Sequence, residues 1–168
     1  DWYQIPKLLG ASYWSEPYYD DGGGNMMMTT YSKPLYDESG NLYAIITADL
    51  SLEWLTDLVS DIKAFENSFN LMVSRNASYI VHPDHNLILN ETIYSSTYGD
   101  EDESLKKMQE DMVNCNAGEV LRDMPDGKYF VFYSPVETTC WSVAIVCPRS
   151  ELYLGVKKLR TLLIILGV

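Results

Sequence analysis

Apolar and polar residues at the start of this chain follow the pattern of β-strands, and turn residues separate the segments. Short apolar or alternating runs bounded by Gly, Asn and Asp predict strands. Three strands in a meander are predicted, at residues 11–19, 26–31 and 42–50. A helix is predicted next, ending near Lys63, because apolar residues then recur every three to four positions and Ser51 can cap the helix start.

A second set of strands follows a short polar stretch at 64–68, where we place a domain boundary. One amphipathic helix is predicted over 100–114, with its acidic residues at the end that the helix dipole favours. The strands of this second unit are predicted at residues 69–74, 78–82, 118–122, 128–134 and 140–147. This order of elements predicts an α+β fold with antiparallel sheets in two successive units, residues 1–63 and 64–150.

The chain closes on an apolar run, LRTLLIILGV at 159–168. This run is shorter than the roughly 20 apolar residues that cross a bilayer. It suits either an amphipathic terminal helix or the start of a membrane span. We favour the second interpretation, so residues 151–168 are expected to form a helix and the start of a transmembrane span.

The net charge of −12 narrows the classes of partner. A nucleic-acid-binding protein presents a basic face to the phosphate backbone, so we expect no nucleic acid partner. An anionic membrane surface is also disfavoured as the main partner. The simplest role of these acidic side chains is to keep the domain in solution.

The cysteines, Cys115, Cys140 and Cys147, do not have the spacing of a zinc site. Cys140 and Cys147 stand at the two ends of one predicted strand, where their Cα atoms would be roughly 23 Å apart. That separation is far beyond the reach of a disulfide. We therefore predict buried free thiols.

Motifs of the common catalytic and metal sites are missing from the sequence. There is no G-x-S-x-G elbow, Walker loop or H-E-x-x-H, and no cysteine has a convincing histidine partner. His82, Asp84 and His85 share one predicted turn, but a metal would need further ligands, so a solvated loop is favoured. We predict no catalytic residue, no metal and no cofactor.

Asp49 lies at the end of an apolar strand, where an unpaired carboxylate is costly to bury. Asp20 ends another strand of the same meander, and Tyr18 shares a strand face with it. Carboxylates and phenols that converge on a pocket would suit an ammonium group. From the pattern alone the simpler interpretation is favoured, in which Asp49 belongs to a helix start and Asp20 forms a turn.

Several segments resemble the double Cache sensor domains of bacterial transmembrane receptors. Residues 14–20 (WSEPYYD), 28–35 (MTTYSKPL), 37–40 (DESG) and 48–52 (ADLSL) resemble the membrane-distal module. Residues 127–129 (GKY), 133–135 (YSP), 140–142 (CWS) and 148–152 (PRSEL) resemble the membrane-proximal module. The resemblance covers nearly the whole chain, and the order and spacing of the first group make it fairly specific.

The resemblance implies two tandem PAS-like modules, of which the first is incomplete. It places residues 1–63 in the distal module, 64–150 in the proximal module, and 151–168 in a helix leading into a membrane span. It also implies a location outside the cytoplasm, a homodimer of the full-length protein, and a cytoplasmic output domain outside this chain.

The resemblance also implies a ligand site. In amino-acid-binding members a Trp-Tyr pair contacts the ligand carboxylate, and a Tyr-x-Asp and a later Asp contact its amine. Trp2, Tyr3, Tyr18, Asp20 and Asp49 match these positions. These members also carry an arginine two residues before the Trp, a position that precedes the first residue of this sequence. With the resemblance included, Asp49 is favoured as a ligand contact.

The function expected is extracytoplasmic sensing of an amino acid or amine-like ligand, and signalling across the membrane. The competing interpretations are a solute-binding protein without a signalling role, an extracytoplasmic enzyme that uses Asp20 and Asp49 as an acid–base pair, and a spacer that binds nothing.

Overall fold

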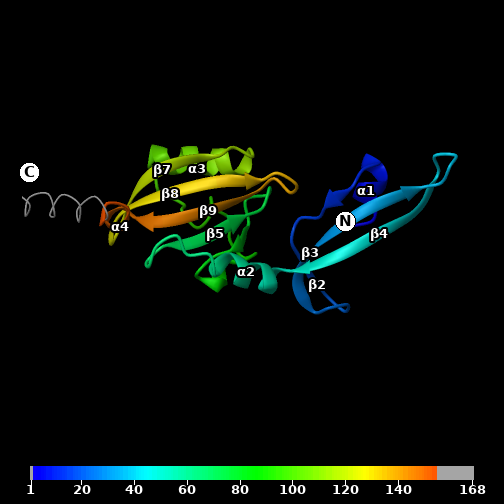
Figure 1. Cartoon of the computed structure of the whole chain (residues 1–168), viewed down its shortest axis with the longest axis horizontal. Coiled ribbons are helices and arrows are strands. Elements are labelled where there is room, and N and C mark those ends of the chain that lie inside the picture. The colour runs from blue at the N-terminus through cyan, green and yellow to red at the C-terminus, as the bar shows by residue number, and fades with distance from the viewer. Residues whose placement is uncertain (1, 155–168) are drawn as a thin grey trace, which may run out of the picture.

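A computed structural model describes residues 2–154 of the chain. They form an α+β structure with a four-stranded and a five-stranded antiparallel sheet. Figure 1 shows the two sheets side by side along the long axis, with α2 between them. We call them the first sheet and the second sheet. Their assignment to two Cache modules stays a prediction.

The first sheet is built around one long strand, β3 (Met26–Tyr36), with β4 (Leu42–Ser51) along one of its edges. Two short strands, β1 (Tyr13–Trp14) and β2 (Tyr18–Asp20), pair with the other edge in succession. The sequence predicted one strand over 11–19. The structure divides it at Pro17, whose nitrogen cannot donate a ladder hydrogen bond.

A short helix that the sequence did not predict, α1 (Gln4–Leu9), packs against β3. Pro6 lies in its first turn, where backbone N–H groups have no partner within the helix, so the proline is tolerated there. The helix ends at Gly10, whose φ of 64° is left-handed.

β4 runs directly into α2 (Leu52–Ser60), and the Ser51 side chain caps the helix by accepting the Trp54 N–H, as predicted. The helix ends three residues before the predicted Lys63. Asn70 of the second sheet explains this end, because its Nδ2 donates to the carbonyl oxygens of Val59, at 2.6 Å, and of Ile62.

The second sheet has the strand order β6-β5-β9-β8-β7. Its strands are β5 (Phe69–Val73), β6 (Tyr79–Val81), β7 (Gly118–Met124), β8 (Gly127–Val136) and β9 (Trp141–Pro148). A 3₁₀ turn spans His85–Leu87. One face packs against α3 (Glu103–Val113), and the other packs against α2. This is the predicted arrangement of five strands around one helix, with α2 added on the second face.

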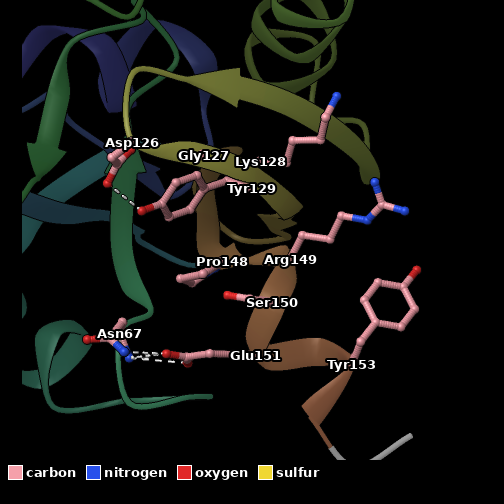
Figure 2. A pocket seen from close by; sticks show the side chains of 10 residues that line it. All are labelled: Asn67, Asp126, Gly127, Lys128, Tyr129, Pro148, Arg149, Ser150, Glu151 and Tyr153. Atoms are coloured by element: carbon pink, nitrogen blue, oxygen red, sulfur yellow. Dashed lines mark hydrogen bonds between the residues drawn. The ribbon is translucent and has the colours of Figure 1, made fainter. Parts of the chain in front are cut away.

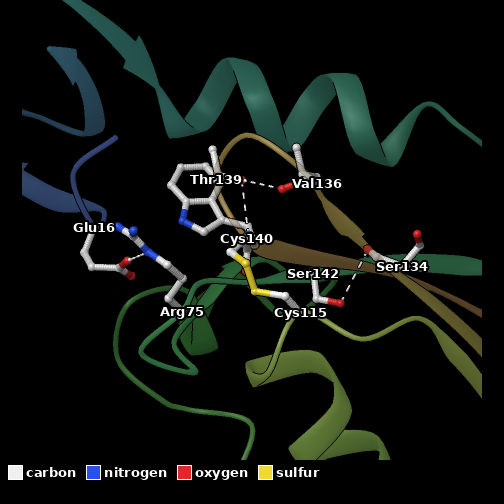
Figure 3. Close-up of a disulfide and its surroundings, with 9 residues drawn as sticks. Glu16, Arg75, Cys115, Ser134, Val136, Thr139, Cys140 and Ser142 are labelled. Carbon is white, nitrogen blue, oxygen red and sulfur yellow. Dashed lines mark hydrogen bonds and ion pairs between the residues drawn. A yellow bond between two sulfur atoms is a disulfide. The ribbon is translucent and has the colours of Figure 1, made fainter. Parts of the chain in front are cut away.

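The free-thiol prediction is wrong for Cys115 and Cys140, which form a disulfide with Cα atoms 5.4 Å apart (Figure 3). The distance expected from the sequence was that between Cys140 and Cys147, at the two ends of one predicted strand. Cys115 lies in the turn after α3, and that turn returns to the start of β9 beside Cys140. Cys147 is a buried free thiol, as predicted.

The described part of the chain ends just after α4 (Arg149–Leu152), which lies at the end of the second sheet farther from the first sheet (Figure 1). Within residues 2–154 no helix has the length and apolar character needed to cross a membrane. The apolar run at 159–168, which we predict to be the start of a span, lies outside the described residues.

Candidate functional site

One face of the first sheet collects the polar residues that the sequence singled out. Asp49 pairs with Thr30, Tyr18 with Met28, and Asp20 with Met26. Residues paired across antiparallel strands point to the same face, as do residues two apart along a strand. Tyr18, Asp20, Thr30 and Asp49 therefore share one face.

A chain of hydrogen bonds crosses this face. The Tyr18 hydroxyl lies 2.8 Å from Thr30 Oγ1, which donates to Asp49 Oδ1 at 2.7 Å. Thr30 has one hydroxyl proton and gives it to the carboxylate, so the Tyr18 hydroxyl donates to Thr30. Thr30 is buried, and Tyr18 is half-buried. Asp49 itself is exposed, and its carboxylate keeps acceptor capacity beyond the bond from Thr30.

A pocket of about 820 Å³ adjoins this hydrogen-bonded chain, between the start of α1 and strands β1 and β2. Three of the predicted residues, Trp2, Tyr3 and Tyr18, line it. The rings of Trp2 and Tyr3 meet edge to face, with centroids 5.8 Å apart. Asp49 is not among the lining residues and connects to the pocket only through Thr30 and Tyr18.

The structure places the Asp20 carboxylate within the glycine turn, where it accepts the backbone N–H of Gly24. This is the turn-forming role that the pattern alone favoured. Asp20 is absent from the lining of the pocket, although it shares the sheet face of Tyr18 and Asp49.

Arg75, in the turn between β5 and β6, connects the wall of this pocket to the second sheet. Its Nε lies 2.6 Å from Glu16 Oε1, and its Nη2 donates to Tyr13 Oη at 3.0 Å and to the Trp14 carbonyl at 2.9 Å. Burial alone would lower the pKa of Arg75, but the hydrogen bond and charge of Glu16 outweigh it and raise the pKa. Figure 3 shows the Arg75–Glu16 pair near the disulfide.

A ring contact supports the same junction, with the indoles of Trp14 and Trp141 centred 6.4 Å apart. Sequence reasoning identified neither Arg75 nor this ring pair. Residues 75–77 fall between the strands predicted at 69–74 and 78–82, and no local signal indicates what a residue in such a turn contacts in another sheet.

The first 57 residues match the family profile described as "Methyl-accepting chemotaxis protein-like, first PDC sensor domain". Methyl-accepting chemotaxis protein TlpB of Bacillus subtilis is 36% identical over 84 residues, which are 49% of this chain and 12% of TlpB. The extracellular domain of the histidine kinase mmHK1S-Z3 is 31% identical, with a TM-score of 0.78 over 95% of this chain and 57% of that domain. Residues 1–57 thus match a sensor-domain family, and the chain as a whole shares the fold of an extracellular sensor domain, so we call it the sensor region.

A more distant structure, the ligand-binding domain of the Pseudomonas aeruginosa chemoreceptor PctB with L-Gln, shares the fold of this sensor region. It is 19% identical, with a TM-score of 0.64 over 96% of this chain and 64% of that one. The sensor region thus spans just over half of the histidine kinase domain that it resembles and about an eighth of TlpB.

The His82–His85 turn of the sensor region is held by its own residues. His82 Nδ1 accepts the Asp84 N–H at 3.0 Å, and Asp84 Oδ1 accepts the Asn86 N–H at 3.0 Å. Burial lowers the pKa of His82, against the opposing influence of Asp84. Within residues 2–154, no three or more His, Cys, Asp and Glu side chains gather as a metal ion would require.

An open pocket of about 900 Å³ lies beside α4 at the far end of the sensor region (Figure 2). Several polar groups of its wall bind one another. Asn67 donates to Glu151, and the Tyr129 hydroxyl donates to Asp126 at 2.7 Å. These groups are therefore already paired, and we assign no ligand to this pocket.

Proposed function

We propose that this chain is the extracytoplasmic sensing region of a transmembrane signalling receptor, and that it binds an amino acid or a related amine at the first sheet. The observation that carries this proposal is the Tyr18–Thr30–Asp49 hydrogen-bonded chain beside a pocket with aromatic walls. Ligand-binding domains of similar fold support it, because that of PctB was solved with L-Gln and with L-Arg, and that of a further protein, Mlp24, with asparagine.

The amine end of the ligand is assigned to Asp49 and Tyr18. A carboxylate that already accepts one proton from Thr30 keeps further lone pairs for an ammonium group, and such charge-assisted hydrogen bonds are among the stronger ones. Asp20 is kept in the proposed site as a second carboxylate for the amine, since it lies on the same face of the first sheet as Asp49. To reach the ligand it would release the Gly24 N–H.

The carboxylate end of the ligand is assigned to Trp2 and Tyr3, as the family resemblance implies. Their side chains are about half exposed, at 48% and 39%, and line the pocket at the start of α1. The indole N–H of Trp2 and the hydroxyl of Tyr3 are donors that a carboxylate accepts, and the rings add apolar contact with small conformational cost. Closure of the pocket over a ligand would cover this exposed ring surface.

Signal transmission is assigned to α2. Asp49 lies two residues before Ser51, which caps α2. The helix packs through Leu52, Leu55 and Val59 on the face of the second sheet opposite α3. A shift at Asp49 would move this helix. A ligand can bias the receptor only through different affinities for two arrangements of these elements. The full-length receptor is expected to be a membrane-anchored homodimer with a cytoplasmic output domain.

No catalysis is proposed for this region. The relatives that match it are a chemoreceptor and sensor domains, and Asp20 and Asp49 accept hydrogen bonds from different partners, Gly24 and Thr30. Recovery of an unchanged ligand after prolonged incubation with the chain is expected. Appearance of a product would support the enzyme interpretation.

Calorimetry with a panel of amino acids, amines and small carboxylates tests the ligand. Asp49→Asn keeps an acceptor for Thr30 but removes the charge, so it should weaken binding of the best ligand by about tenfold or more. Glu38→Gln, in an exposed hairpin turn, is the matched loss of one negative charge and should leave the affinity unchanged. Full affinity in both Asp49→Asn and Asp49→Ala would remove this residue from the site.

A further inference from the structure

A third and smaller cavity, of about 250 Å³, lies in the unit built on the second sheet and is partly open to solvent. It is lined by the sheet face that packs on α3, by α3 itself, and by the segment that contains His82, Leu87 and Ile93. Most of its wall is apolar. Pockets for drug-sized ligands measure about 300–1,000 Å³, so this one suits a molecule of fewer atoms.

Arg122 is the unusual residue of this cavity. Along β7, Val120, Arg122 and Met124 share the face that packs on the core, and Arg122 is only 8% exposed. Its Nη2 donates to Asp100 Oδ2 at 2.6 Å. Its Nε is buried without a hydrogen-bond partner, and lies 3.8 Å from Asp102 Oδ2, beyond hydrogen-bond distance.

The two aspartates balance the charge of Arg122 from the solvent side. Their side chains are 38% and 36% exposed, whereas that of Arg122 is 9% exposed. Arg122 thus lines the cavity along its side chain and reaches with its guanidinium group toward two solvated carboxylates. A buried N–H without an acceptor is destabilising, so a ligand oxygen that reaches the Nε would be stabilising.

A second donor lines the same cavity. His82 Nδ1 accepts the Asp84 N–H, which places the proton of the neutral ring on Nε2. The ring packs edge-on against Tyr79 at 4.9 Å, and the Tyr79 hydroxyl is held by Ser96 Oγ at 2.8 Å. The polar part of the wall therefore offers N–H donors, while the rest of the wall offers hydrocarbon.

We propose that this cavity is a second binding site, for a short-chain monocarboxylate. One carboxylate oxygen accepts from Arg122 Nε and the other from His82 Nε2, and the hydrocarbon chain lies among Leu71, Met108 and Val131. An amine would bring donors to a wall that lacks free acceptors. A dicarboxylate would bury a second charge against apolar side chains, which is unfavourable.

Hexanoate is the probe, titrated into the whole chain by calorimetry and followed by amide NMR shifts. One hexanoate is expected to bind per chain, at least tenfold more tightly than hexan-1-ol or hexylamine. The largest shifts are expected at 79–82 and 120–124. Arg122→Gln should weaken hexanoate by about tenfold or more, and His82→Phe by several-fold.

Two controls define the site. Arg149→Gln removes an arginine outside the cavity and should leave hexanoate affinity unchanged. Asp49→Ala should also keep full hexanoate affinity, so loss of the amino-acid site and loss of this site are distinguishable. If circular dichroism shows Arg122→Gln to be unfolded, the half-buried His82→Phe variant decides.

Three results would overturn the proposal. The first is the absence of saturable hexanoate binding to the folded wild-type chain. The second is unchanged affinity in a folded Arg122→Gln, or in His82→Phe where the arginine variant does not fold. The third is a set of NMR shifts confined to residues 2–20, which would place the carboxylate in the pocket of the first sheet.

Discussion

Thr30 decides how the polar face of the first sheet is organised. It is 2% exposed, yet its hydroxyl is satisfied on both sides, by a proton from Tyr18 and by the carboxylate of Asp49. A buried hydroxyl of this kind is stabilising only while both partners remain. The neighbouring Thr29 is equally buried but points to the opposite face, where its Oγ1 donates to the Ser15 carbonyl at 2.9 Å.

This pair of threonines permits a matched test. Thr30→Val and Thr29→Val each remove one buried hydroxyl, and each is expected to lower the free energy of unfolding by about 1–3 kcal/mol. Only Thr30→Val should weaken the amino-acid ligand, by several-fold, because only Thr30 holds Asp49. Urea unfolding and calorimetry measure the two effects. Equal ligand affinity in both variants would contradict the role of Thr30.

His82 gives a pH dependence whose sign is fixed by its pKa. Burial places the folded-state pKa below the usual value of 6.5. Below 6.5 the unfolded chain then binds more protons than the folded chain, so this contribution to stability is lost as the pH falls. Urea unfolding at about pH 5 and about pH 7.5 should show a smaller pH difference for His82→Phe than for wild type. An unchanged difference would show that His82 is not the titrating group.

At the scale of elements, the two sheets are joined by three features. β4 continues into α2, Arg75 holds Glu16 and Tyr13, and Trp14 meets Trp141. These contacts place the wall of the first pocket against the second sheet. A movement of the pocket wall would therefore be transmitted directly to the second sheet, whose strand β9 continues into α4.

The Arg75–Glu16 pair can be tested with a double-mutant cycle of Arg75→Gln and Glu16→Gln. The two residues are in contact and partly buried, so a coupling energy of about 0.5–3 kcal/mol in unfolding is expected. Hydrogen exchange of residues 13–16 should accelerate in each single variant. Strictly additive effects, with unchanged exchange, would mean that this ion pair does not join the sheets.

The order of elements followed largely from the sequence, and their boundaries did not. The hydrophobic pattern predicted β3, β4 and the strands of the second sheet, because buried strands need continuous or alternating apolar residues. It missed α1, whose short length leaves too little periodicity to detect. It placed the end of α2 too late, because Asn70, a residue of another element, binds the carbonyl oxygen of Val59 in the last turn and that of Ile62 just beyond the helix.

At the scale of the whole molecule, the Cys115–Cys140 disulfide closes a segment of 25 residues that contains β7 and β8. Cys140 directly precedes Trp141, which packs under α2 and against Trp14. The crosslink therefore fixes the end of the second sheet that faces the first. Such a link belongs to proteins of oxidising compartments, in keeping with the proposed location.

Removal of this disulfide is expected to lower the free energy of unfolding by about 2–4 kcal/mol. Cys115→Ala/Cys140→Ala should reproduce the effect of dithiothreitol on wild type and should itself be insensitive to dithiothreitol. Cys147→Ala serves as the control, since it removes a buried free thiol and should keep the sensitivity of wild type. Equal stability of oxidised and reduced wild-type protein would contradict a structural role for the crosslink.

The α+β class, most of the strands and helices, and the residue types of a sensor region could be predicted from the sequence. These properties depend on local periodicity, on turn residues and on motif spacing, which are all written along the chain. The folded chain was needed to show that Thr30 links Tyr18 to Asp49, that Asp20 binds its own turn, and that Arg122 lines a cavity. Those facts depend on strand register and on contacts between residues far apart in sequence, and no local pattern carries that information.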